Sequence, residues 1–400
     1  MKILIANNYY YPNMEGGAEF SVQLLAENLV KAGHDVSVLT MDGEENLQIS
    51  NPDIIHGVKI YRSYSKQIYR RRILKDKRHF SDKILNGLHS IWNPRMNRDV
   101  KKALGYIKPD VIHTNNLVSM SYWLWKYAKK QGIPVVHTLR DYWLIDPTTN
   151  IGKTPKSVVW LFQAYHKYLS NTFIDFVTSP SDRTLEIFRN YGYFQNCVSQ
   201  KIVNSISFNE ELLAEVRKEK VNRNESKIGY VFAGKVSEYK GIKLLVEAFE
   251  KANVNATLSV CGTGDLERWI SDRHNKNIIL LGKLKQKELF EEYKKADVLI
   301  VPSLWEEPFG RIVIEGAQYA LPTIGSNKGG VPEIIRELNY GKIFDPDNEK
   351  QLIECLKLFS DRDYVREYVV KGPEHLEIYS AKRQIESFVK VYKEIVKVNQ

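Results

Sequence analysis

Two glutamates, Glu307 and Glu315, are the residues of this chain whose type and spacing point most directly to chemistry. They stand at the two ends of the run Glu307-Pro308-Phe309-Gly310-Arg311-Ile312-Val313-Ile314-Glu315. The apolar segment 297–303 before this run predicts a buried strand, and the Pro-free stretch 311–320 predicts a helix. Gly310 then stands at the helix entrance, where unpaired N–H groups and the helix dipole attract an anion.

Helical geometry separates the roles of the two carboxylates. At 3.6 residues per turn, this spacing would rotate Glu315 by roughly 80° from Glu307 if both were helical. We therefore expect Glu307 in a loop and Glu315 on the helix, rather than an acid and a base on one helical face. Two carboxylates around an anion-attracting helix start suit a ligand that is both polyhydroxylated and anionic. A nucleotide sugar is such a ligand.

Two other loops carry groups suited to phosphate. The loop 234–241 follows an apolar segment and contains Lys235 and Lys240, whose ammonium groups could neutralise a diphosphate leaving group. Gly16 and Gly17 follow the first predicted strand, where they allow the backbone to approach a phosphate or a sugar hydroxyl. The alternatives are a solvated loop and a tight turn. The glycine pair lacks the GxGxxG pattern, which argues against a hydride-transfer enzyme.

Three weaker patterns lie elsewhere in the second half. The loop Gly282-Lys283-Leu284 could bring backbone against a nucleotide base near Leu284, whereas Gly262-Thr263-Gly264 is a lone Gly-x-Gly. The segment Asp345-Pro346-Asp347 has the Asp-x-Asp spacing with which some sugar transferases hold a metal ion. Because Pro346 favours a turn, we predict no metal there and no cofactor apart from the donor substrate.

Three titratable residues follow predicted strands of the first half. His113, His137 and Asp141 stand at strand ends and could face a ligand. His137 is more often a strand residue than a catalytic base, so it is assigned no role.

The elements that must position these residues form two α/β patterns. A chain of 400 residues is long for one core. The strand, helix and strand expected over 3–6, 22–30 and 35–40 form a βαβ unit, and a similar pattern restarts at Lys227. Apolar patterns predict further strands of the first half at 111–113, 134–139, 176–179 and 201–203, and in the second half a strand at 228–233 followed by an amphipathic helix around 244–249. We predict two Rossmann-like, doubly wound parallel-sheet domains, 1–205 and 206–380, facing a central cleft, with the last helix, 381–400, packing back on the first. Such folds bind ligands at the carboxyl ends of their strands.

Composition excludes several classes of protein. The chain is 43% hydrophobic and 26% charged, as globular proteins are, and contains no apolar run long enough to span a membrane. The apolar stretch at the start is too short for a signal peptide, so we expect a cytoplasmic protein. Its three cysteines are widely spaced and odd in number, which favours reduced thiols over disulfides or a metal knuckle.

A net charge of +10 favours anionic partners, and part of this excess is local. The segment 66–80 contains seven basic residues, one acidic residue and two aromatic ones, and we expect it to hold the protein against an anionic membrane surface. A solvated basic loop is the alternative. No nucleic-acid-binding module is visible.

These motifs together resemble the retaining glycosyltransferases of family 4, which have the GT-B fold. The resemblance covers nearly the whole chain, and its most specific part is 302–333. It implies that Glu307 contacts donor-sugar hydroxyls, that Glu315 binds the nucleotide ribose, and that Lys235 and Lys240 hold the diphosphate. It also implies that Phe309, Gly310 and Arg311 offer backbone amides, and that no metal is needed.

Two positions depart from the family pattern. Lys235 stands where such enzymes usually have Arg, and Arg140 stands where they usually have His near the reacting sugar. Lys235 thus offers a point charge instead of a bidentate fork.

We predict a hexosyl-type transferase that moves a sugar from a UDP- or GDP-linked donor to an acceptor hydroxyl with retention of configuration. The acceptor is expected to be a lipid-linked or cell-surface glycan intermediate at the inner membrane face. Three alternatives stay open: a soluble sucrose- or glycogen-type synthase, an inactive sugar-nucleotide sensor and, more distantly, an NAD-dependent oxidoreductase.

Overall fold

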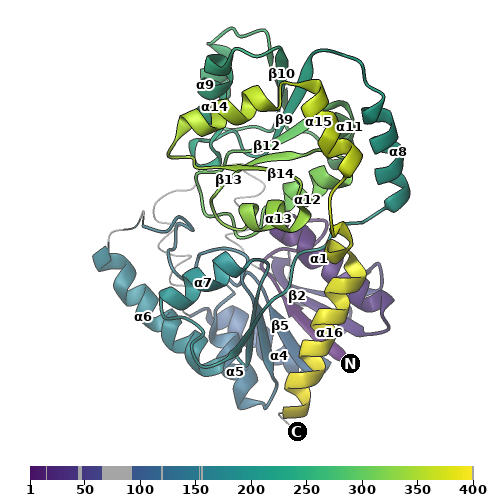
Figure 1. Ribbon diagram of the computed structural model, residues 1–400. Coiled ribbons are helices and arrows are strands. Elements are labelled where there is room, and N and C mark those ends of the chain that lie inside the picture. Colours follow the sequence, from purple (N-terminus) through teal and green to yellow (C-terminus); the bar gives the residue numbers. More distant parts are fainter. Residues whose placement is uncertain are drawn as a thin grey trace. The chain divides into compact units, whose positions relative to one another are not determined.

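The computed structural model describes residues 1–14, 16–43, 47–64, 92–118, 120–152, 154 and 156–398. The chain forms two compact units, one comprising Met1–Ser205 with Ala381–Gln400 and the other Ile206–Ser380. Each unit is built around its own sheet (Figure 1). No helix in the described ranges is long and apolar enough to cross a membrane.

The first unit has a mostly parallel sheet in the order β3-β4-β2-β1-β5-β6-β7-β8. Only β3 and β4 pair antiparallel among its described strands. The strands are β1 Lys2–Ala6, β2 Asp35–Gly43, β3 Asp53–Ile55, β4 Val58–Tyr64, β5 Val111–Thr114, β6 Val135–Thr138, β7 Phe176–Ser179 and β8 Val198–Lys201. The four-residue strands β5, β6 and β7 are buried along their whole length, as central parallel strands should be.

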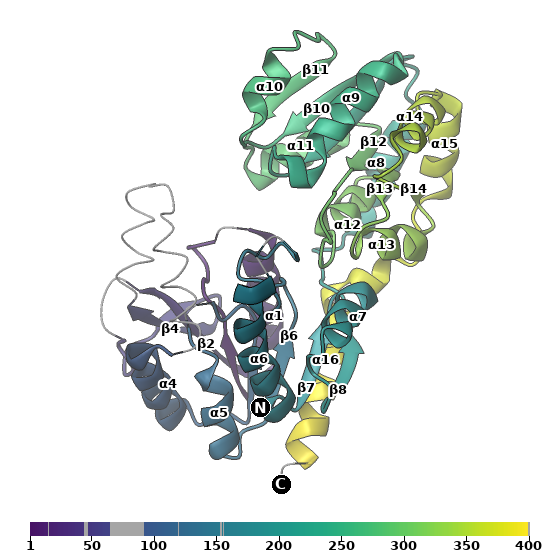
Figure 2. The ribbon, with the colours of Figure 1, turned by 90° about the vertical axis from the view of Figure 1, so that its left-hand side faces the viewer.

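Helices cover both faces of this sheet (Figure 2). They are α1 Gly17–Lys31, α4 Pro94–Ile107, α5 Trp123–Lys130, α6 Lys156–Phe173, α7 Asp182–Asn190 and α16 Ala381–Val398. Helices α1 and α16 share one core with the sheet, in which Leu25, Phe388 and Tyr392 pack against Ile3 and Ile5. The last helix of the chain thus belongs to the first unit.

The second unit has an entirely parallel sheet in the order β11-β10-β9-β12-β13-β14. Its strands are β9 Ile228–Ala233, β10 Ala256–Cys261, β11 Ile278–Gly282, β12 Val298–Val301, β13 Thr323–Ser326 and β14 Gly341–Phe344. Its helices are α8 Glu210–Val221, η1 Glu238–Lys240, α9 Ile242–Ala252, α10 Glu267–Ser271, α11 Gln286–Lys295, α12 Arg311–Gln318, α13 Val331–Leu338, α14 Glu349–Leu358, α15 Arg362–Lys371 and η2 Leu376–Tyr379. The first strand of the unit, β9, therefore lies near the middle of the sheet.

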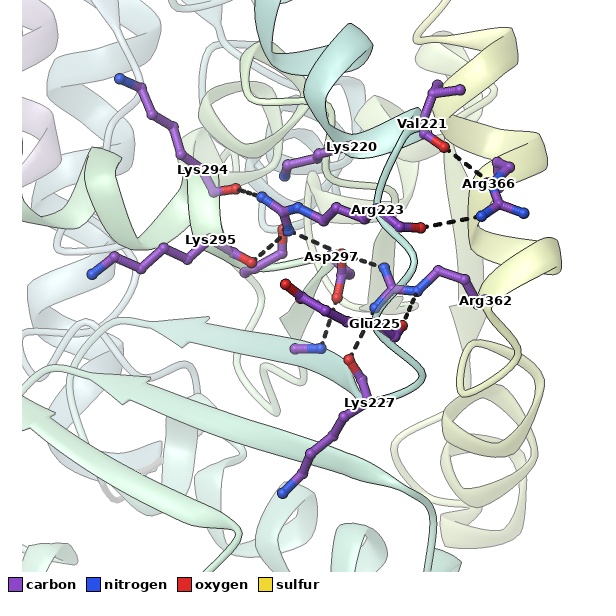
Figure 3. A network of polar contacts seen from close by, with 12 residues as sticks. Lys220, Val221, Arg223, Glu225, Lys227, Lys294, Lys295, Asp297, Arg362 and Arg366 are labelled. Carbon is purple, nitrogen blue, oxygen red and sulfur yellow. Dashed lines mark hydrogen bonds and ion pairs between the residues drawn. The ribbon is translucent and has the colours of Figure 1, made fainter.

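A buried carboxylate ties together the amino-terminal side of the second sheet. Asp297, directly before β12, accepts hydrogen bonds from the Arg362 guanidinium at 2.6 Å, from the Arg223 guanidinium at 3.1 Å and from the Gly229 N–H at 2.9 Å. Figure 3 shows Arg223 and Arg362 converging on it from different segments. The same guanidinium groups donate to carbonyls of Lys294 and Lys227, so they also satisfy backbone acceptors at element ends.

The structure confirms the GT-B class of fold and corrects several element bounds. The helix expected over 311–320 ends at Gln318, and the strand expected at 201–203 is β8, which ends at Lys201. Strands β3 and β4 were not predicted. The basic segment 66–80 lies outside the described residues.

Candidate active site

The second sheet changes direction between β9 and β12. From β9 the chain winds outward to β10 and β11, and it then returns to the other side of β9 to form β12, β13 and β14. The loops that follow β9 and β12 therefore diverge at the carboxyl edge of adjacent strands, where doubly wound folds bind their ligands. Lys235 and Lys240 follow β9, and Glu307 follows β12. The topology brings these predicted residues to one place.

The Lys240 ammonium and the Glu307 carboxylate form an ion pair across this switch point. Their side chains are 22% and 16% exposed, so both are largely shielded without being sealed from a ligand. The Lys240 Nζ also lies 5.2 Å from the centre of the Trp305 ring and 5.8 Å from that of Tyr239. Ring faces attract a cation and hold it in place.

Lys235 lies near the Tyr239 ring as well. Its Nζ is 5.8 Å from the centre of the Tyr239 ring, and the residue is exposed. Two ammonium groups thus lie near Tyr239, in the loop that follows β9. This arrangement can bring two positive charges to a single dianionic group.

Close backbone contact joins the two loops. The Leu304 N–H donates to the Tyr239 carbonyl at 3.0 Å. Gly241 has a φ of 74°, and a Cβ there would come 1.7 Å from the Pro302 carbonyl oxygen, so only glycine fits. The loop that carries the lysines is thereby fixed against the loop that carries Glu307.

Gly329 and Gly330 hold the Glu307 loop in place through backbone hydrogen bonds. The Gly330 N–H donates to the Glu307 carbonyl at 2.7 Å, and the Gly329 N–H donates to the Glu306 carboxylate at 2.8 Å. Glu306 therefore has a structural task, whereas the Glu307 side chain meets Lys240. The neighbouring glutamates differ in role because the loop turns one toward α13 and the other toward the lysine.

The start of α12 has the predicted form. Gly310 is its N-cap residue with a φ of 100°, and Phe309 is buried with its ring 6.1 Å from that of Tyr379. The Phe309 side chain is thus part of the core, and its backbone is what it can offer a ligand. The positive end of the α12 dipole and the backbone at the start of this helix can attract an anion.

Glu315 lies one helical turn into α12. Its carboxylate accepts from Arg311 Nε at 2.7 Å, and both side chains are about as shielded as Glu307. Burial, and then the nearby Glu315 charge, hold the pKa of Tyr293 well above its usual range. Glu307 and Glu315 therefore stand on different elements with different partners, as the spacing predicts.

The weaker motifs have mixed outcomes. Leu284 is half-buried in the loop between β11 and α11, and Gly262 packs on the loop after β9, where a Cβ would come 1.8 Å from the Gly234 carbonyl oxygen. The Asp347 N–H donates to the Asp345 carboxylate at 3.1 Å, so the Asp-x-Asp segment forms the predicted turn.

In the first unit, Gly16 and Gly17 are exposed at the start of α1. Gly16 has an extended backbone, and a Cβ there would meet only the Glu19 carboxylate at 3.6 Å. The Gly16 N–H donates to that carboxylate at 2.9 Å. The fold itself does not require glycine at this position.

A cluster of amides surrounds Asp141 at the carboxyl ends of β1, β5 and β6. The Asp141 carboxylate accepts from the Asn116 amide at 2.7 Å and from the Trp143 N–H at 2.9 Å. The Asn116 N–H in turn donates to the Asn7 side chain at 3.0 Å. Burial raises the pKa of Asp141 to about 6, opposed by the Trp143 N–H and assisted by the Glu19 charge.

The two histidines of the first unit are interior residues. His113 lies between the Tyr392 hydroxyl and the Thr138 hydroxyl, each at 2.6 Å, and burial, then Arg140, holds its pKa well below the usual value. His137 contacts the Thr114 hydroxyl at 2.9 Å, and burial lowers its pKa to about 3. Both stay neutral at physiological pH and link elements of the core.

Arg140, which stands where similar enzymes usually have His, contacts two asparagine side chains. Its guanidinium donates to Asn115 at 2.8 Å and to Asn204 at 2.7 Å. It therefore connects the end of β5 to the last residues of the first unit's main segment.

Sequence reasoning missed the aromatic residues Tyr239 and Trp305 and the amide Asn116. Tyr239 adjoins Lys240 in the sequence, and Trp305 precedes Glu307 by two positions, so their closeness to the motif residues could have indicated a place in the site. No sequence pattern indicates the role of Asn116, because its contact with Asp141 depends on the pairing of β5 with β6.

Comparison with known proteins agrees with this geometry. The family described as Glycosyltransferase Family 4 matches residues 15–199, and the family described as Glycosyl transferases group 1 matches residues 214–374. An uncharacterized 42.6 kDa protein in the cps region of Klebsiella pneumoniae is 30% identical over 349 residues, which cover 84% of this chain and 88% of that protein.

Two solved structures share the fold. The sucrose-phosphate synthase of Thermosynechococcus elongatus has a TM-score of 0.74 at 18% identity, and the alignment covers 99% of both chains. HepE of Anabaena, in complex with UDP-glucose, has a TM-score of 0.64 at 15% identity over 98% of this chain and all of the other. The two α/β units and their switch-point loops define a glycosyltransferase of the GT-B class. The chain belongs to the family 4 glycosyltransferases, with the Glycosyltransferase Family 4 model matching its first unit and the Glycosyl transferases group 1 model its second.

Proposed function

We propose that this glycosyltransferase takes a hexosyl group from a UDP- or GDP-linked donor and transfers it to an acceptor hydroxyl with retention of configuration and without a metal ion. The observation that carries the proposal is the Lys240–Glu307 ion pair at the switch point of the second sheet, with Lys235 beside it. HepE binds UDP-glucose on the same fold, which supports a nucleotide-sugar donor.

In this proposal each charged group has one part of the donor to hold. Glu307 accepts from sugar hydroxyls, and Glu315 accepts from the ribose. Lys235 and Lys240 neutralise the diphosphate, assisted by the amides at Gly310 and Arg311. The backbone near Leu284 meets the base, and Gly16 and Gly17 allow close approach from the first unit.

The chemical step follows from these positions. Charge accumulates on the diphosphate as the bond from the anomeric carbon to the phosphate oxygen breaks, and two ammonium groups stabilise that charge. The acceptor oxygen attacks from the same face, and its proton passes to the departing phosphate oxygen. Neither glutamate acts as a covalent nucleophile, unlike the carboxylate pair of retaining hydrolases.

The first unit is proposed to bind the acceptor. Asn116 and Asp141 provide donors and an acceptor of hydrogen bonds at the carboxyl edge of its sheet, as a sugar hydroxyl requires. We propose that the acceptor is a lipid-linked glycan intermediate of polysaccharide biosynthesis. We also propose that the protein is cytoplasmic and binds peripherally to an anionic membrane, with segment 66–80 taking part in this binding.

The test is a thermal-shift panel of nucleotides and nucleotide sugars, followed by NMR of the product formed from the donor that stabilises most. We expect stabilisation by UDP- or GDP-linked sugars and a first-formed product with the donor's anomeric configuration. An inverted product would contradict the retaining mechanism. Tight donor binding without turnover on any acceptor or water would indicate an inactive sensor.

A further inference from the structure

Helix α6 presents an apolar face to solvent. Trp160, Leu161 and Tyr168 are 69%, 70% and 56% exposed, and Ala164 is exposed beside them. Positions 160, 164 and 168 repeat every four residues, and 161 adjoins 160, so the four side chains lie along one side of the helix. Grouped apolar side chains of this size mark a contact surface. We call these four residues the α6 face.

The opposite side of α6 is firmly held in the first unit. The buried His166 ring packs 5.1 Å from that of Tyr122, which precedes α5. The Gln163 side-chain amide donates to the Ile145 carbonyl at 2.9 Å, which joins the helix to the loop that follows Asp141. The α6 face is therefore a fixed surface of a packed helix.

The described part of the loop before α6, residues 146–152 and 154, has hydrogen bonds of its own. The Asp146 carboxylate accepts from the Thr148 N–H at 2.9 Å and from the Thr154 hydroxyl at 2.6 Å. This loop runs from the Asp141 cluster to the start of α6. The α6 face is thus connected along the chain to the residues proposed to bind the acceptor.

The helices packed beside α6 are strongly basic. Helices α4, α5 and α6 pack side by side and contain four, three and two basic residues (Figure 1). Their single acidic residue, Asp99, is 3% exposed and accepts from the Ser63 hydroxyl at 2.6 Å. Helices α1 and α16, in contrast, carry charges of both signs. The positive charge therefore belongs to the α4–α6 side of the sheet.

Aromatic residues accompany this charge. Trp123 and Tyr127 stack with ring centres 4.8 Å apart, and the Lys101 Nζ lies 5.4 Å from the Trp123 ring. Trp92, 54% exposed, meets the edge of Trp123 at 6.3 Å. Tryptophan and tyrosine with nearby lysines are the residues that proteins place at the headgroup level of a bilayer.

We propose that the α6 face inserts among the headgroups of an anionic lipid bilayer, with the basic residues of α4, α5 and α6 supplying the electrostatic attraction. Apolar insertion combined with positive charge gives two signals, which together suffice for reversible peripheral binding. The inference deepens the proposed function, because it names the surface that would meet the membrane carrying the lipid-linked acceptor. It rests on the proposed function only for that acceptor.

The test is sedimentation of the full chain with vesicles of phosphatidylcholine alone or mixed with phosphatidylglycerol, without donor or acceptor. We expect binding to the mixed vesicles that weakens with salt, and little binding to phosphatidylcholine. The Trp160→Ser/Leu161→Ser variant should bind at least about tenfold more weakly. Ile54→Ser, equally exposed at 70% on β3, is the matched control and should bind like the wild type.

A charge variant separates the two contributions. Lys102→Glu/Lys130→Glu, on exposed positions of α4 and α5, should weaken binding to the mixed vesicles, whereas Lys218→Glu on the second unit should have a smaller effect. Thermal unfolding of each variant checks that it is folded.

Two outcomes would overturn the inference. One is binding of the folded Trp160→Ser/Leu161→Ser variant at wild-type strength. The other is a wild-type dimer in lipid-free solution that this variant converts to a monomer, which would assign the α6 face to a second copy of the chain. Because no donor is used, either outcome leaves the proposed transfer reaction standing.

Discussion

The Lys240 ammonium and the Glu307 carboxylate satisfy each other before any donor is bound. In the proposed donor complex, a diphosphate and a sugar hydroxyl would each take over part of this pairing. The exchange keeps both charges partnered throughout, which avoids the cost of leaving one buried charge alone. At the residue scale, the pair thus fits the proposed ligand, which has an anionic part next to a hydroxyl-bearing part.

The proposed contact of Glu315 with the ribose gives a prediction that depends on the ribose 2′-hydroxyl. If its carboxylate accepts from the ribose, Glu315→Gln should weaken binding of UDP or GDP about tenfold, because a charged acceptor is replaced by a neutral one. The same variant should bind the 2′-deoxynucleotide almost as well as the wild type does. Calorimetric titration of both ligands measures the difference. Glu354→Gln, exposed on α14, is the control. Equal losses for both nucleotides would place Glu315 away from the 2′-hydroxyl.

His166 gives a prediction about pH. Burial lowers its pKa to about 4, and its ring packs 4.1 Å from that of Phe162. The unfolded chain takes up the proton near pH 6.5, so the stabilisation is present above about pH 6.5 and is lost as the pH falls toward about 4. His166→Phe should remove this dependence and gain about 2 kcal/mol of unfolding free energy relative to the wild type on going from about pH 7.5 to about pH 5.

Denaturant unfolding at the two pH values measures the His166 effect. His375→Asn is the control, because His375 is exposed and Asn tolerates its left-handed backbone. Parallel pH profiles for His166→Phe and the wild type would show that His166 is not the group that titrates.

The positions of some of these residues in the fold could be predicted from sequence, and those of others could not. Glu307, Lys240 and Gly310 stand in loops whose position follows from the strands before them, so spacing alone brought them to one edge. The contact of Asn116 with Asp141 joins neighbouring strands, and nothing local in the chain encodes it. Whether Glu306 or Glu307 faces the lysine depends on the Gly329 contact, which is equally non-local.

At the scale of elements, the two sides of the second sheet have different tasks. The carboxyl edge carries the lysines and Glu307, and the amino edge carries the Asp297 network. The Asp297 network, which stabilises the sheet, and the residues proposed to hold the donor thus lie at opposite ends of β9 and β12. Changes at Asp297 should alter unfolding while leaving donor contacts in place.

Asp297→Asn provides the corresponding prediction. Asp297 is 4% exposed and neutralises both Arg223 and Arg362, so the amide would leave two guanidinium groups without their charge partner. We expect a loss of about 3 kcal/mol in the free energy of unfolding of the second unit. Asp363→Asn, whose exposed carboxylate pairs with Arg366, should cost less than about 1 kcal/mol. Denaturant unfolding compares them, and equal losses would contradict the structural role given to Asp297.

Element prediction succeeded where periodicity was strong. Buried strands such as β7 and β9 and the amphipathic helix α9 follow from their apolar patterns. The exposed strand β8 has alternating burial and ends at Lys201, so its apolar signal was weak and the prediction fell three residues late. Strands β3 and β4 form a hairpin at the sheet edge, where polar residues obscure the pattern.

At the scale of the whole molecule, the two units repeat one design. In each, the first strand lies inside the sheet, and polar groups gather at the carboxyl edge beside it: Asn7 and Asn116 in the first unit, Lys235 and Glu307 in the second. The repeated βαβ pattern allowed this design to be predicted. The difference in charge between the two edges supports the proposal that the second unit binds the diphosphate.

Titration of the best-binding nucleoside diphosphate into the wild type, Lys240→Ala, Glu307→Ala and Lys218→Ala tests the central claim most directly. If the switch point of the second sheet holds the donor, Lys240→Ala should weaken diphosphate binding about tenfold to a hundredfold, because it removes a charge-assisted contact. Glu307→Ala should weaken binding of the nucleotide sugar more than that of the nucleotide. Lys218→Ala, on exposed α8, should bind like the wild type. Unchanged affinity in Lys240→Ala would contradict the account.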